Sequence, residues 1–560
     1  MARPRGETSA SRRWQDEHLR NRSARLRDER DTLIEIDIVA TIIWIVSFVL
    51  VTVTVTGLSG RVGWSAPVAL VAVGAIASFI PGVPEITVEP DLVLYGILPP
   101  LLFAAAIRTP LADILARRDS IFVLSVGLVA FTVAVVGFSL WWLVPTISLA
   151  AAFAFGAVVA PTDAVAVTAI AGRLRLPRRV VTVLESESLL NDATALVALN
   201  ASIAAIVSIL NPWDVAWEFG VALVGGIGVG FVVGYTLSAI RKRLRAPVLD
   251  TSLSLAIPYI AFIPAQLIGG SGVLAVVVAG LLLGQRSPLV QSAEARIAES
   301  INWRTIRYLL ENAVFLFIGL SLAGIVGGMQ ESEFGLGEVV ALSALVLGLL
   351  VLSRFIFVLA TTVLYEKGPK LLRRRRWGWK TSIAISSAGI RGVVTLAAVF
   401  LLPKETPERE LLQFLAFVVV AGTLLEGLAL PWVIRSLKLP PPDSSQEMME
   451  KHNLLAEAQT AGLARLDLEV TDNDDPAAVS RLRVNARFIT EAMSRDTAPG
   501  TETSPAVYNR LRRTMIDAER QAVLDARAEG RYQERAVRDV LRSIDAEETA
   551  LSAHRSKADD

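Results

Sequence analysis

The sequence contains no cysteine and only three histidines. The lack of cysteine excludes disulfides, thiolate metal sites and thiol catalysis. His18, His452 and His554 all lie in polar stretches near the two ends of the chain. Neither an imidazole proton relay nor a histidine-ligated zinc is therefore expected in the apolar part of the chain. Any proton carrier there must be a carboxylate.

Charged residues are also scarce, at 19% of the 560 residues, whereas 53% are hydrophobic. This composition differs from that of a soluble globule and indicates an all-α polytopic membrane protein, whose surroundings are the lipid bilayer. The net charge is +1, and the basic residues form short clusters between apolar runs. We therefore do not expect nucleic acid as a partner.

The apolar runs divide the chain into three parts. A membrane-spanning helix needs roughly 20 largely apolar residues. A polar N-terminal tail (1–36) is expected to precede a transmembrane domain (37–437), and a helical C-terminal domain (438–560) without a phosphate loop or metal cluster follows. The transmembrane domain contains thirteen apolar segments, near 37–57, 63–80, 92–107, 120–144, 147–172, 181–210, 215–240, 253–268, 272–284, 309–327, 339–364, 381–402 and 411–434.

Basic residues set the expected orientation, because Lys and Arg favour cytoplasmic loops. Loops rich in arginine alternate with loops nearly free of basic residues, and this pattern places the C-terminal domain in the cytoplasm. Thirteen crossings then put the N-terminus outside, although its many arginines favour the inside. If that tail is cytoplasmic, the first segment does not span and twelve crossings remain.

Two segments have an interrupted character. The fifth contains Gly156 and Pro161 in mid-membrane, and the twelfth contains Gly389 and Gly392 around Arg391. Their positions in the order give them opposite directions through the membrane. Paired, broken, oppositely directed helices are typical of inverted-repeat transporters with an ion site at the midplane, although Pro and Gly are also tolerated in spanning helices for other reasons.

The break in the fifth segment is followed by an acidic residue. Pro161 cannot donate a backbone hydrogen bond, so a carbonyl upstream is freed. That carbonyl and the Thr162 hydroxyl are oxygen ligands suited to a small hard cation, beside Asp163. The alternative is that Thr162 caps a half-helix and Asp163 complements its positive end. Because acids inside a bilayer are rare and costly, we favour an ion-binding role.

The sixth segment begins with a polar helical face. Glu187, Ser188, Asn191 and Asp192 are related by four-residue steps and so cluster on one side of a helix. Glu187 requires a buried partner, for which Arg391 is the natural candidate in a structural ion pair. Asp192 is then left without an assigned partner, and its carboxylate can hold either a proton or a cation. The alternative is a permanently neutral Asp192.

Other polar residues within apolar segments receive structural predictions. Arg354 is expected to snorkel toward the cytoplasm or to pair locally. Glu426 and Glu311 are possible ion-path residues, but a structural pairing with arginines is favoured. Gln266 and Tyr259 are expected to form helix-packing hydrogen bonds.

Four motifs in order make the chain recognisable. "APTDAVAV", "ESESLLNDA", "SGVLAVVVAGLLLG" and "GIRGVVTLA" follow one another between Leu92 and Leu437. This combination resembles the monovalent cation:proton antiporter-1 family, the sodium/proton exchangers, in its bacterial type. The resemblance implies a homodimer of about thirteen helices with inverted repeats, in which a core containing two crossed, unwound helices moves to give alternating access.

The resemblance also implies roles for individual residues. Asp192 would be the principal ligand of the cation and the proton, and Asp163, Ser188 and Thr162 would complete a Na⁺ site. Asn191 would be the neutral member of an Asn-Asp pair, which in the family goes with electroneutral exchange.

The family pattern also supports the Glu187–Arg391 pair, but the chain departs from it elsewhere. Ala104 stands where many members have an acid, which in some of them helps to line the ion site, and Gln266 also replaces an acid. Glu426 stands where many have a neutral residue, and the hypothesis is that it compensates for a missing carboxylate.

The predicted function is therefore secondary active exchange of Na⁺ (or Li⁺) for H⁺, serving sodium transport and pH homeostasis in a bacterial plasma membrane. Such a protein uses no cofactor and is not an enzyme, and its partners are monovalent cations. The same fold working on K⁺ is the nearest alternative, because oxygen ligands alone do not specify ion size. A cation channel is a more distant alternative, since no filter-like repeat is visible.

Overall fold

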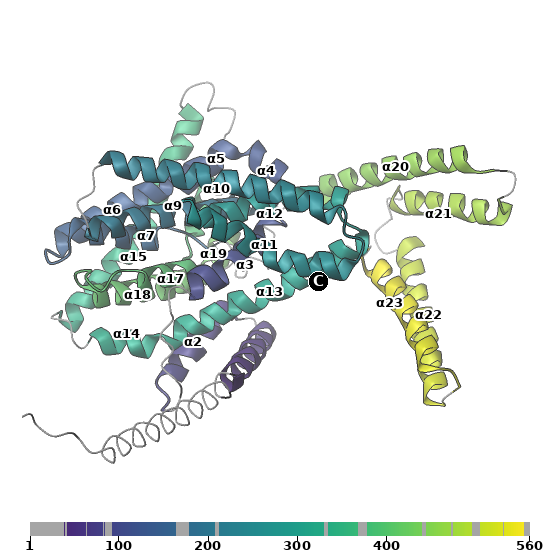
Figure 1. Ribbon diagram of the computed structural model, residues 1–560, viewed down its shortest axis with the longest axis horizontal. Coiled ribbons are helices and arrows are strands. Elements are labelled where there is room, and N and C mark those ends of the chain that lie inside the picture. The colour runs from purple at the N-terminus through teal and green to yellow at the C-terminus, as the bar shows by residue number, and fades with distance from the viewer. Residues whose placement is uncertain are drawn as a thin grey trace, which may run out of the picture. The chain divides into compact units, whose positions relative to one another are not determined.

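The computed structural model describes residues 39, 42–62, 64–81, 83, 92–163, 178–207, 212–329, 334–367, 378–439, 444–471, 474–494, 504–529 and 531–553. Every regular element in these residues is a helix (Figure 1). The chain divides into two compact units, Met1–Pro442 and Asp443–Asp560.

The first unit consists of apolar helices. It begins with a helix over Ile42–Val62. The elements that follow are α2 (Ala66–Ser78), the π-helical stretch η1 (Leu92–Ile97), α3 (Leu98–Ala106), α4 (Leu111–Ala116), α5 (Arg118–Phe122), the π-helical stretch η2 (Val123–Leu128), α6 (Val129–Leu143), α7 (Leu149–Val159), α9 (Arg178–Val207), α10 (Pro212–Arg241), α11 (Pro247–Leu267), α12 (Gly272–Val290), α13 (Ala293–Leu320), α14 (Leu322–Met329), α15 (Leu336–Lys367), α16 (Trp379–Ser387), α17 (Val393–Phe400), α18 (Arg409–Gly427) and α19 (Leu430–Leu437).

These helices make the chain a polytopic membrane protein. Among the described residues, nine helices are long and apolar enough to cross a bilayer, and Ala66–Ser78, Leu94–Ala106 and Leu149–Val159 are shorter apolar helices. Each of the thirteen predicted apolar segments overlaps a helix. The predicted continuation of the fifth segment to residue 172 lies outside the described residues.

Helix α13 begins sixteen residues before the predicted apolar segment 309–327. Its N-cap is Ser292, whose hydroxyl accepts a hydrogen bond from Ala295 N at 3.2 Å, and Glu294 lies in the first turn. The early turns are amphipathic, so average hydropathy does not reveal them. The basic stretch that contains Arg304 and Arg307 is therefore helical, and it reaches the cavity described below.

Helices α10 and α12 lie side by side and are packed closely through glycine (Figure 1). A β-carbon at Gly226 would lie 2.6 Å from Ser271 O, and one at Gly230 would lie 2.7 Å from Ala275 O. Small residues at such positions let helix backbones approach in a membrane, where van der Waals packing drives helix association.

A buried ionic cluster joins the adjoining ends of α10, α11, α12 and α13. Arg241 Nε donates to Asp250 Oδ1 at 2.6 Å, and Arg241 Nη2 donates to Glu299 Oε1 at 2.7 Å. Gln291 Nε2 donates to Asp250 Oδ2 at 2.6 Å and to Glu299 Oε2 at 3.0 Å. Because each carboxylate has several donors, the cluster compensates the cost of burying its charges.

The described residues of the second unit form four polar helices in two antiparallel pairs, α20 (Ser444–Glu469) with α21 (Pro476–Ser494), and α22 (Ser504–Ala528) with α23 (Glu534–Ala553). Arg512 on α22 binds Glu547 on α23 through two hydrogen bonds of 2.7 Å. The guanidinium lowers the pKa of the Glu547 carboxyl below its ordinary value. This pair therefore helps to join α22 to α23 at neutral pH.

Candidate cation site

The first of the three sides of the site is the end of α7. This helix stops at Val159, and Pro161 has no N–H with which to continue it. Beyond the end of the helix, the Ala160 carbonyl accepts a hydrogen bond from Arg391 Nη1 at 2.6 Å. Residues 160–163 thus form a non-helical stretch at the end of an apolar helix, and a buried arginine satisfies one of its carbonyl oxygens.

The second side of the site is the non-helical stretch between α16 and α17. Residues 388–392 are not helical. Asp163 N donates to Ile390 O at 2.8 Å, and Arg391 N donates to Thr423 Oγ1 on α18 at 3.0 Å. Two unwound stretches that are more than 200 residues apart in the chain therefore satisfy each other's backbone groups. Non-helical backbone at membrane depth is tolerated where protein surrounds it in this way.

Helix α9 supplies the third side. Asn191 Nδ2 donates to Thr162 Oγ1 at 2.9 Å and to Thr162 O at 3.3 Å. The Thr162 hydroxyl in turn donates to Glu187 Oε1 at 3.1 Å. Thr162, Glu187 and Asn191 are all buried. The α9 face therefore fixes the orientation of the unwound stretch at 160–163.

The partner of Glu187 differs from the prediction. Its carboxylate binds Arg354 on α15, with Nη1 to Oε1 at 2.6 Å and Nη2 to Oε2 at 3.1 Å. The predicted Glu187–Arg391 pair is therefore wrong in this structure. Of the two alternatives given for Arg354, snorkelling is wrong, because its guanidinium forms an ion pair with Glu187. Arg354 is 1% exposed. It also donates to Ile385 O through Nε and Nη2, so it joins α9 to the end of α16.

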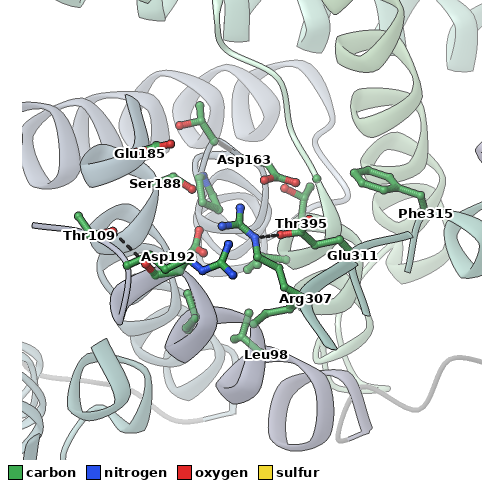
Figure 2. Close-up of a pocket in the computed structure, with 18 residues that line it drawn as sticks. Leu98, Thr109, Asp163, Glu185, Ser188, Asp192, Arg307, Glu311, Phe315 and Thr395 are labelled. Carbon is green, nitrogen blue, oxygen red and sulfur yellow. Dashed lines mark hydrogen bonds and ion pairs between the residues drawn. The ribbon is translucent and has the colours of Figure 1, made fainter. Parts of the chain in front are cut away.

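A cavity of about 330 Å³ lies against these three elements (Figure 2). Asp192, 6% exposed, lines it from α9, and Asp163 lines it from the unwound stretch. The other polar residues of its wall are Arg108, Thr109, Thr162, Glu185, Ser188, Arg307, Glu311 and Thr395. Carboxylate, hydroxyl and carbonyl oxygens are the ligands of hard cations. The cavity can therefore offer oxygen ligands and negative charge to a small cation.

The predicted site residues separate into three groups. Asp192, Asp163, Thr162, Ser188 and Glu311 all line the cavity. The other four predicted residues are not among its lining residues: Asn191, Glu187, Arg391 and Glu426. Asn191 and Glu187 hold Thr162, and Arg391 binds the Ala160 carbonyl.

Glu426 lies away from the Asp192 cavity. It lines a separate small cavity together with Arg354, Arg391 and Thr423. Its carboxyl is thus placed near the arginines rather than near the cation site.

Three charged residues of the cavity wall were not predicted. Glu185 lies at the start of the polar α9 face, three residues before Ser188. The residues used to define that face are instead four residues apart. Arg108 follows α3, and Arg307 comes from the amphipathic part of α13. The four-residue spacing of Arg307 and Glu311 was the available signal, since such residues meet on a helix surface.

Gly392 allows the Asp163 carboxyl to lie against the second unwound stretch. A β-carbon at position 392 would lie 2.6 Å from Asp163 Cγ and 2.7 Å from its Cβ. Gly392→Ala is therefore expected to displace Asp163 and to raise the KM for the cation several-fold, measured by cation-driven proton flux in liposomes. Gly324→Ala is the control, because a β-carbon there meets nothing within 4 Å. Equal effects of the two substitutions would contradict this role.

The fold and the cavity are typical of one class, the polytopic secondary transporters, because a carboxylate-lined cavity lies at paired unwound segments among apolar helices. Residues 46–436 match the family "Sodium/hydrogen exchanger, transmembrane". The chain belongs to this sodium/hydrogen exchanger family, and it is thus a monovalent cation/proton antiporter of the membrane and not an enzyme.

Individual relatives agree with this assignment. An uncharacterised Na⁺/H⁺ exchanger of Mycobacterium tuberculosis is 31% identical over 93% of this chain and 98% of its own. A sodium, potassium, lithium and rubidium/H⁺ antiporter of Bacillus subtilis is 32% identical over 64% of this chain and 56% of its own. The solved sodium proton antiporter of Methanocaldococcus jannaschii has the same fold, with a TM-score of 0.55 and 19% identity over 70% of this chain and 97% of that one.

Proposed function

We propose that the protein exchanges Na⁺ (or Li⁺) for H⁺ in an electroneutral cycle, with cation and proton competing for Asp192. The observation that carries this proposal is the position of Asp192, buried yet on the wall of a cavity that also contains Asp163. Two carboxylates in a cavity of low dielectric repel each other unless a cation or a proton neutralises them. The site is therefore suited to hold one or the other.

Competition alone then couples the two fluxes. We propose that Asp192, Asp163, Ser188 and oxygens of Thr162 ligate the cation, which must leave before Asp192 accepts a proton. Moving an unneutralised charge through a low-dielectric barrier is costly. We therefore propose that the site turns from one side of the membrane to the other only when a cation or a proton occupies it. Asn191, which is neutral and bonded to Thr162, adds no further charge to this exchange, which favours one proton per cation.

We further propose a homodimer with thirteen crossings, inverted repeats and crossed broken helices at residues 160–163 and 388–392. The hydrogen bond from Asp163 N to Ile390 O supports the crossing. The expected cytoplasmic side is the side of the arginine-rich loops. Since Arg108 and Arg307 line the cavity, we propose that this conformation opens to the cytoplasm of a bacterial cell, where the C-terminal unit also resides.

A K⁺/H⁺ exchanger of the same mechanism is the second candidate. The printed name of the Bacillus subtilis relative includes potassium and rubidium beside sodium and lithium. In this chain Ala104 is buried in α3, so that position adds no carboxylate to the cation site. A site with fewer charged ligands selects less strongly for the smaller ion.

Purified protein in liposomes with an entrapped pH dye tests the choice of ion. Sodium, lithium, potassium and choline are added in separate runs, with the membrane potential clamped at zero and then at about −100 mV. The proposal predicts proton flux with sodium and lithium, none with choline, and equal rates at both potentials. Flux with potassium alone would select the second candidate, and rates that depend on the potential would overturn electroneutrality.

A further inference from the structure

Arg307 places a permanent positive charge inside the cation cavity. It lines the cavity from α13 with its side chain 26% exposed, and Glu311, one turn later, is 16% exposed. The two form an ion pair, and Figure 2 shows Arg307 pointing into the cavity, where a dashed line joins it to Glu311. Because a guanidinium stays protonated at any physiological pH, this charge cannot be removed by titration.

The charges of the cavity wall show what Arg307 would do without Glu311. Asp163, Asp192 and Glu185 are the other acids of the wall, and Arg108 is the other base. Arg108 already has a partner, because its Nη2 donates to Ser300 O at 2.8 Å. Without the Glu311 carboxylate, Arg307 would be a long, flexible cation whose available partners are Glu185 and the two acids of the proposed cation site.

Resting on the exchange function proposed above, we propose that Glu311 is a positioning residue that holds Arg307 away from Asp163 and Asp192. By doing so it sets the apparent affinity of the site for the transported cation. A guanidinium released into the cavity would compete with the cation for the same carboxylates, as a tethered inhibitor does. The effect of removing Glu311 should therefore depend on the presence of Arg307.

This dependence separates positioning from direct ligation. If Glu311 were itself a cation ligand, its removal would weaken cation binding whether or not Arg307 is present. If it only holds Arg307, its removal has no effect once Arg307 is gone. A double-mutant cycle distinguishes these cases, because it isolates the interaction between two side chains from their separate effects.

The experiment measures KM for Na⁺ and kcat in liposomes for the parent, Glu311→Gln, Arg307→Gln and the double variant, each across pH 6 to 9. Glu311→Gln is expected to raise KM about tenfold at every pH, the size of one partly screened charge interaction, with little change in kcat. Arg307→Gln is expected to lower KM, and the double variant to match it. Arg304→Gln is the control, since Arg304 is exposed on the same helix and is not part of the cavity wall.

An equal rise in KM from Glu311→Gln with and without Arg307 would overturn the proposal, as would no rise in the parent. If Glu311→Gln does not fold, Arg307→Gln decides: a lower KM supports the proposal, and an unchanged or higher KM overturns it. A parent that moves no protons with any cation would instead refute the proposed function. The two failures are therefore distinguishable.

Discussion

Asp192→Asn is expected to reduce cation-driven proton flux to the level of protein-free liposomes. Asparagine keeps the size and most hydrogen bonding of the side chain, but it cannot take up a proton or supply a negative charge to a cation. Because the exchange proposed here consists of nothing more than the alternation of these two occupants on one carboxylate, no cycle remains. The measurement is dye-reported proton flux with sodium, lithium and potassium in separate runs.

The control removes a carboxylate elsewhere in the membrane unit. Asp119 lies at the start of α5, where its side chain is 44% exposed and 3.9 Å from Arg118 Nε. Asp119→Asn should exchange ions like the parent. If Asp192→Asn retained exchange, Asp192 would be a structural acid and the proposed mechanism would be wrong.

Arg354→Gln is expected to destabilise the protein more than Arg391→Gln does. Arg354 holds the Glu187 carboxylate in a fully buried pair, so its loss leaves an uncompensated charge, which typically costs about 3–5 kcal/mol. Arg391 is equally buried, but its side chain donates to the Ala160 carbonyl and not to a carboxylate. The readout is thermal unfolding of the detergent-solubilised protein, followed by its monodisperse fraction in size-exclusion chromatography.

A second substitution tests the cause. In the Arg354→Gln background, Glu187→Gln removes the unpaired charge and should recover part of the lost stability. The same substitution should give no recovery in the Arg391→Gln background. If Glu187→Gln recovered stability only in the Arg391→Gln background, the Glu187–Arg391 pair expected from the sequence would be the correct one.

Much of the site could be predicted because spacing determines it. The four-residue steps of Ser188 and Asp192 put both on one face of α9, and that face does line the cavity. Pro161 and Gly392 lie at breaks in otherwise apolar segments, and the backbone is unwound at both. In each case the chemistry of the residue acts locally, on its own helix.

The choice between two arginines could not be predicted in this way. Arg354 and Arg391 are both buried near Glu187, and only the rotation and depth of α15 decide which guanidinium meets the carboxylate. Hydropathy also missed the early turns of α13, because they alternate charged and apolar residues. Arg307 was lost with them, although it lies in the same cavity as Asp192.

The most direct test of the central claim, competition at Asp192, is the pH dependence of KM for the transported cation in liposomes. If proton and cation bind the same carboxylate, KM should rise tenfold for each unit that pH falls below the pKa of the empty site, while the rate at saturating cation stays constant. A KM that does not change with pH, while the maximal rate falls in acid, would show that the two ions bind at different groups.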